Sequence, residues 1–71
     1  MSYEVCISSP PDRELLVAEI FFGHVQWAEI NQEEGVLRVE FYPRPDGRPW
    51  IILYSEAVLA LSEAKQRLVS G

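Results

Sequence analysis

The chain has 71 residues, 6 basic and 11 acidic, and so a formal net charge of −5. This length predicts one small domain over residues 1–71. A single cysteine excludes an internal disulfide, and one cysteine with one histidine falls short of a four-ligand zinc site. No apolar run reaches the ~20 residues that cross a bilayer, and the start lacks the pattern of a signal peptide. We therefore expect a cytoplasmic protein with no membrane partner, no metal and no cofactor.

Runs of apolar and β-branched residues, separated by turn residues, predict strands over 3–7, 15–22, 25–32, 36–42 and 50–54. Gly23 and His24 form a two-residue turn between the second and third runs. Glycine at its first corner predicts a type II′ turn. Gly35 ends the next loop in the left-handed position of a G1 bulge. Both turns indicate antiparallel hairpins.

The lengths of these turns predict the register of the strands. The first turn places Phe22 opposite Val25, Ile20 opposite Trp27, and Ala18 opposite Glu29. The second loop places Asn31 opposite Leu37, Glu29 opposite Val39, and Trp27 opposite Phe41. Together they gather one apolar face made of Leu16, Ala18, Ile20, Phe22, Val25, Trp27, Leu37, Val39 and Phe41. Glu29 falls on the same face, so we expect it to lie at the rim or to have a partner.

The C-terminal segment predicts one helix over residues 56–69, with Ser55 as its N-cap. Its apolar residues recur at spacings of three and four and form the stripe Ala57, Val58, Leu61, Ala64 and Leu68. The predicted fold is therefore α+β: an antiparallel β-meander of four to five strands followed by one C-terminal helix packed on one face.

One helix covers only one face of a sheet. The predicted opposite face mixes charged residues with Phe21, Ile30 and Tyr42, and exposed apolar surface of this kind marks protein-binding sites. Alternatively, the first strand or the loop over residues 8–14 folds over part of this face. If the face is an exposed binding surface, it predicts a homodimer or another protein partner.

The loop at 43–50 is the most distinctive segment. Arg44 and Arg48 surround a proline-stiffened turn, with Tyr42 before it and Trp50 at its end. Arginine, tyrosine and tryptophan dominate protein-binding hot spots, and a stiff loop loses little entropy on binding. The alternative is a rigid connection in which the arginines pair with neighbouring acids. The predicted binding site therefore consists of six residues: Phe21, Ile30, Tyr42, Arg44, Arg48 and Trp50.

Catalytic chemistry has little support in the sequence. Cys6 and His24, assisted by Glu19 or Glu29, form the one conceivable nucleophile–base set, and no motif spacing supports it. We expect Cys6 to be a small buried strand residue and His24 an exposed turn residue. We name no catalytic residues and expect no enzyme. The acid excess makes nucleic acid an unfavourable partner.

Two short motifs, Trp27–Ile30 (WAEI) and residues 42–50 (YPRPDGRPW), resemble a pattern in short uncharacterised bacterial proteins of about this length. No activity is attached to that group, so the resemblance carries over no functional residue. We expect a non-catalytic protein-binding domain that acts through the open sheet face and the 43–50 loop. Its most concrete form is an immunity or antitoxin-like inhibitor of a basic toxin. The alternatives are a homo-oligomeric structural or accessory subunit and, third, an unrecognised enzyme.

Overall fold

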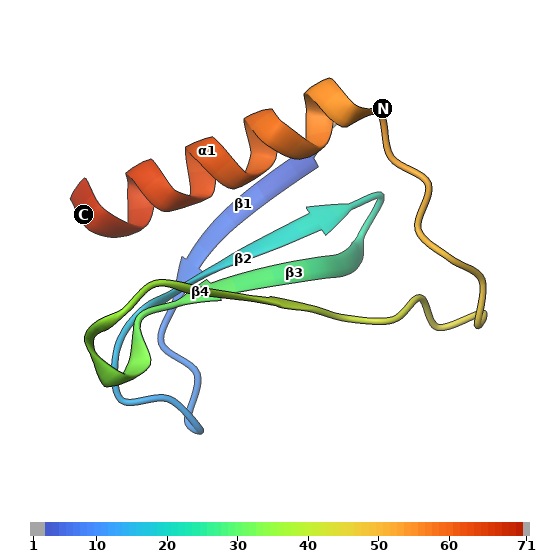
Figure 1. Ribbon diagram of the computed structural model, residues 1–71. Helices are drawn as coiled ribbons and strands as arrows, with labels where there is room; N and C mark the ends of the chain where they lie inside the picture. The colour runs from blue at the N-terminus through green and yellow to red at the C-terminus, as the bar shows by residue number, and fades with distance from the viewer. Residues whose placement is uncertain (1–2, 71) are drawn as a thin grey trace.

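The computed structural model describes residues 3–70 (Figure 1). Four antiparallel strands form one sheet in the order β1-β2-β3-β4, followed by the helix α1. The elements are β1 (Tyr3–Ser8), β2 (Val17–Phe22), β3 (Val25–Asn31), the short 3-10 helix η1 (Glu33–Gly35), β4 (Arg38–Phe41) and α1 (Tyr54–Ser70). The predicted α+β meander with one C-terminal helix on one face is confirmed.

Helix α1 packs on β1 and β2 rather than across the whole sheet. Ala60 and Ala64 are fully buried at this contact, because small side chains let the helix approach the sheet closely. Beneath them, Val5, Ile20 and Phe22 belong to the same apolar core. The predicted helical stripe is right at Ala57, Leu61, Ala64 and Leu68; Val58 is instead 42% exposed, and Ala60 was missed. Among residues 3–70, no helix has the length and apolar character needed to cross a membrane.

A β-bulge changes the predicted register of the central hairpin. Phe22 lies opposite Val25 as expected, but the register shifts between Ile20 and Phe21. Ile20 therefore pairs with Ala28 rather than Trp27, and Ala18 pairs with Ile30 rather than Glu29. The extra residue of a bulge reverses which side chains face the core. It turns Glu29 away from the helix and places Ile30 in the core.

The register of the β3–β4 pair also differs from the prediction by one residue. Arg38, rather than Leu37, lies opposite Asn31. Val39 pairs with Ile30 instead of Glu29, and Phe41 with Ala28 instead of Trp27. Glu34 and Gly35 both adopt positive φ in the loop before β4, whereas the expected G1 bulge needs only one left-handed residue. The additional left-handed residue accompanies the shifted register.

The turn between β2 and β3 is type I′ rather than type II′. Gly23 has φ 58° and His24 has φ 70°, so both corner residues are left-handed. Type I′ requires this at both corners, whereas type II′ requires it only at the first. Either turn matches the twist of a hairpin, so the prediction of a two-residue connection is unaffected.

The predicted fifth strand over 50–54 is wrong. Residues 42–53 form a connection without strand or helix that leaves the end of β4, turns at 44–47 and passes to the start of α1 (Figure 1). Because α1 lies over β1 and β2, this segment has to travel away from β4 and cannot run beside it. The helix then begins at Tyr54, where the Ala57 N–H donates to the Leu53 carbonyl at 3.0 Å. Ser55 is therefore inside the first turn and is not the N-cap.

Candidate protein-binding surface

The face opposite α1 carries a polar network centred on Glu29, which is only 5% exposed. One carboxylate oxygen accepts a hydrogen bond from the Tyr42 hydroxyl at 3.1 Å. The other lies 2.9 Å from the Arg13 guanidinium and accepts a bond from the Asn31 amide at 3.2 Å. Arg13 and Asn31 also bond to Glu40 on β4. Glu29 is thus a buried charge with a cation and two hydrogen-bond donors, which is how proteins accommodate such groups.

The sequence predicts an uncovered, partly apolar surface on the face opposite α1, and this network shows that the prediction is wrong. Arg13 comes from the loop between β1 and β2, so that loop covers part of the face, as the alternative interpretation held. Ile30 is buried in the core on the helix side. Phe21 is half-buried, and the Tyr42 hydroxyl is engaged by Glu29. Phe21, Ile30 and Tyr42 therefore do not form one exposed apolar patch.

The tyrosines hydrogen-bonded to acids predict a loss of stability in alkali. Burial, and then the hydrogen bond to Glu29, raise the pKa of Tyr42 above 10.0; a bond to Glu63 does the same for Tyr3. Their contribution to folding is full below pH ~10 and falls at higher pH, because the unfolded tyrosines lose their protons first. We expect Tyr42→Phe to flatten this fall in urea-unfolding experiments across alkaline pH. Tyr54→Phe, at an exposed position, is the control; an equal change in both variants would contradict the assignment.

The 42–50 segment is folded back on the protein rather than extended into solvent. The Trp50 indole N–H donates to the Tyr42 carbonyl at 2.8 Å, and its ring lies 6.4 Å from that of Phe22. Arg44 lies over Trp50, 5.6 Å from the ring centroid, and pairs with Asp46 at 2.9 Å.

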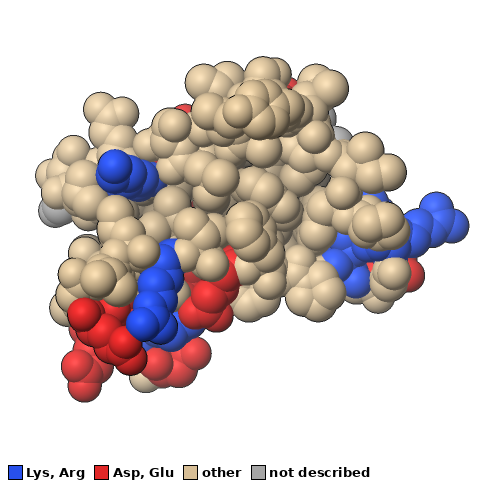
Figure 2. Space-filling model, in the orientation of Figure 1, with Lys and Arg blue, Asp and Glu red and all other residues tan. Residues whose placement is uncertain are grey.

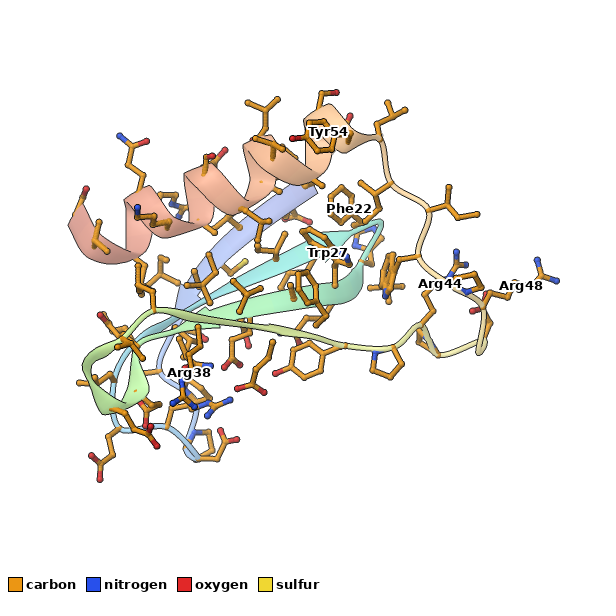
Figure 3. All side chains as sticks on the ribbon, viewed as in Figure 1. Phe22, Trp27, Arg38, Arg44, Arg48 and Tyr54 are labelled. Carbon is orange, nitrogen blue, oxygen red and sulfur yellow. The ribbon has the colours of Figure 1, made fainter. Side chains whose placement is uncertain are left out.

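Arg48 projects outward from the 42–53 segment, beyond Arg44 (Figure 3). The backbone N–H of Arg48 donates to Asp46, and its side chain is exposed. The structure thus brings Arg44 and Trp50 together, with Arg48 beyond them. Their role in binding stays a prediction.

Cys6 and His24 are not brought together. Cys6 lies opposite Glu19 in the middle of the β1–β2 pair, whereas His24 is at the tip of the next hairpin, beyond the Tyr3–Phe22 pair. The Tyr3–Phe22 pair is already three strand residues from Cys6, about 10 Å along the sheet, and His24 lies farther still. Cys6 is also exposed, so the prediction of a buried cysteine is wrong. The conceivable nucleophile–base set has no geometric basis.

The uncovered apolar surface lies on the helix-bearing face, beyond the part that α1 covers. Leu37, Val39 and Phe41 alternate along the segment that contains β4, and they are 43%, 42% and 60% exposed. Val39 and Phe41 share a face with the core residues Ile30 and Ala28, their strand partners. Phe41 packs one side against Trp27, with ring centroids 5.3 Å apart. Its other side is left open.

One flank of α1 continues this surface. Glu63 and Arg67 contact β1, with Glu63 accepting from Tyr3 and Arg67 donating to the Val5 carbonyl. Positions on the opposite flank of the helix therefore face the β3–β4 side. That flank holds Tyr54 and Val58, which are both exposed, and the half-buried Leu61.

We call Leu37, Val39, Phe41, Tyr54 and Val58 the β4–α1 apolar surface. Figure 2 shows an uncharged expanse running from the helix towards β4, and the charged side chains visible in this view lie mainly to either side of it. The alternating pattern of the β4 residues predicts an apolar face but places them in the covered core.

Comparisons with protein-family models, with curated proteins and with solved structures find no match to this chain.

Proposed function

We propose that this chain is a non-catalytic protein-binding domain that docks a partner on the β4–α1 apolar surface. The observation that carries the proposal is the exposure of Phe41, Val39 and Leu37 beside a helix flank on which Tyr54 and Val58 are also exposed. Contiguous apolar surface costs free energy in water, and on soluble domains it marks sites where another protein binds. The proposed site replaces the opposite face, where the Glu29 network makes the surface polar.

The chemistry of the chain favours a basic partner with an apolar contact face. The net charge of −5 attracts positively charged proteins and speeds their encounter. An immunity or antitoxin-like inhibitor of a basic toxin is the specific form of the proposal that fits this charge. In that case, the association rate falls as salt is added, because screening shortens the reach of the field.

The proposal is tested by comparing surface variants in one capture experiment. Tagged wild-type protein, Phe41→Ser, Val58→Ser and the control Leu59→Ser are used as baits in extract of the organism that makes the protein. Leu59 is also exposed but lies on the helix flank opposite Leu61, because successive residues are 100° apart. The captured protein is then purified, and its affinity and salt dependence are measured with each bait.

We expect one basic protein to bind the wild type and Leu59→Ser alike. Loss of Phe41 from the centre of an interface weakens binding by about 30-fold, which corresponds to about 2 kcal/mol. Equal binding to Phe41→Ser and Leu59→Ser would show that the β4–α1 apolar surface is not the site. An association rate that does not change with salt would count against the inhibitor of a basic toxin.

A further inference from the structure

The two edges of the sheet are treated differently. At the β1 edge, α1 supplies side chains: the Arg67 guanidinium donates to the Val5 carbonyl at 2.7 Å, and Tyr3 bonds to Glu63 at 2.8 Å. At the β4 edge, nothing within residues 3–70 hydrogen-bonds to the outward main-chain groups of residues 37–41. Residues 36–42 also contain neither proline nor lysine, which commonly protect an edge from pairing.

The hydrogen bonds to β3 establish which main-chain groups of β4 are open. The Tyr42 N–H donates to the Trp27 carbonyl at 2.9 Å. In an antiparallel pair, alternate residues direct both main-chain groups to the same neighbour. Arg38 and Glu40, like Tyr42, therefore face β3. Leu37, Val39 and Phe41 direct their N–H and C=O groups to the free edge.

We infer that β4 pairs antiparallel with β4 of a second copy of this chain, about a two-fold axis at Val39. In this register Val39 lies opposite the partner subunit's Val39, and Leu37 lies opposite the partner subunit's Phe41. Every outward N–H and C=O of Leu37, Val39 and Phe41 then has a partner. On the opposite face, Arg38 lies across from the partner subunit's Glu40, and the two-fold axis repeats this pair.

The charges select this register over its neighbours. Hydrogen bonding is preserved only when the register moves by two residues, and either move loses the opposite-charge pairs. One move places Arg38 against the partner subunit's Arg38, and the other places Glu40 against the partner subunit's Glu40; like charges directly opposite each other destabilise a sheet. The Arg38 side chain, which pairs with Glu34 at 2.6 Å, is 54% exposed, and the Glu40 side chain, which bonds to Arg13 and Asn31, is 45% exposed. Both therefore keep surface that a second copy can reach. The segment from Leu37 to Phe41 is thus complementary to itself.

The dimer forms through the main-chain groups at the edge of β4, so the two faces of the sheet are not covered by the partner subunit. Because Val39 meets its own copy, both helices lie on the same face of the joined sheet. The exposed side chains of the two β4 strands then form one continuous apolar strip between the helices. This dimer and the binding of a different protein on the face are separate events.

The dimer is tested by measuring the mass of the full chain in solution over a range of concentrations, by light scattering or sedimentation. We expect a dimer of twice the 8.1 kDa chain mass for the wild type. Arg38→Glu places acid opposite acid and weakens the dimer roughly tenfold. Arg48→Glu makes the same charge change at an exposed position in the 42–53 segment, outside residues 37–41, and is expected to leave the dimer unchanged. Circular dichroism verifies that both variants are folded.

Two further measurements assign the interface to β4. Mixing Arg38→Glu with Glu40→Arg restores opposite charges across the axis, so the mixture is expected to dimerise at lower concentration than either variant alone. Amide hydrogen exchange at Val39 is expected to slow at dimer concentrations, whereas Glu40, already bonded to β3, is protected throughout. A wild type that stays monomeric up to about 1 mM, equal weakening by Arg38→Glu and Arg48→Glu, or a dimer without Val39 protection would each overturn the inference.

Discussion

Ile20→Ala is expected to lower the free energy of unfolding by about 3–4 kcal/mol. Ile20 is fully buried at the centre of the sheet, where it pairs with Val5 on one side and Ala28 on the other. Truncation removes buried apolar area and leaves a cavity beneath α1. Ala60 and Ala64 already place this helix close to the sheet. Domains of this size rarely exceed about 3–5 kcal/mol of total stability, so most molecules are expected to unfold.

Urea unfolding followed by circular dichroism measures this loss at a fixed protein concentration. Val58→Ala is the matched control, because Val58 is 42% exposed and its truncation is expected to cost under about 0.5 kcal/mol. If the two variants unfold at the same urea concentration, Ile20 does not occupy the core position described above.

Arg13→Ala is expected to lower the free energy of unfolding clearly more than a substitution at an exposed loop position does. Removing one partner of a buried ion pair costs about 3–5 kcal/mol, since the remaining charge has lost its compensation. We expect a smaller value here because the Arg13 side chain is 21% exposed and water partly replaces it. Glu29, with a side chain only 6% exposed, is the group left without its cation.

The double variant Arg13→Ala with Glu29→Gln tests this explanation. Glutamine keeps hydrogen-bonding capacity for Tyr42 and Asn31 but carries no charge, so the double variant is expected to be more stable than Arg13→Ala alone. Urea unfolding of the four proteins forms a double-mutant cycle whose coupling term is the measured quantity. An Arg13→Ala variant no less stable than Arg48→Ala, at an exposed loop position, would contradict a structural role for the network.

The fold could be predicted from the sequence wherever a local pattern decides the structure. Alternating residues and the Gly23–His24 turn identify the central hairpin, and the three-four spacing identifies the helix. The bulge after Ile20 could not be predicted, because one inserted residue leaves the apolar pattern of each strand almost unchanged. It nevertheless exchanges the faces of Glu29 and Ile30, and with them the predicted location of the open surface.

The candidate site depended on the position of α1, which is a tertiary property. Leu37, Val39 and Phe41 have the pattern of core residues, and they lie on the predicted face. They are exposed because α1 packs on the distant strands β1 and β2. Ala60 could have indicated this, since it and Ala64 are one turn apart and form a narrow face suited to close packing. The predicted stripe contains Ala57 and Ala64 but omits Ala60 and includes Val58, which is exposed.

The hydrogen bonds between β1 and α1 determine when the chain can fold during its synthesis. Tyr3 bonds to Glu63 and Val5 to Arg67, so these elements from opposite parts of the sequence stabilise each other. A nascent chain that has not yet released α1 from the ribosome exposes Ile20 and Phe22 to solvent and to chaperones. Cooperative folding therefore waits for α1 to emerge, and the long loop that must close makes this step slower than in a helical bundle of equal size.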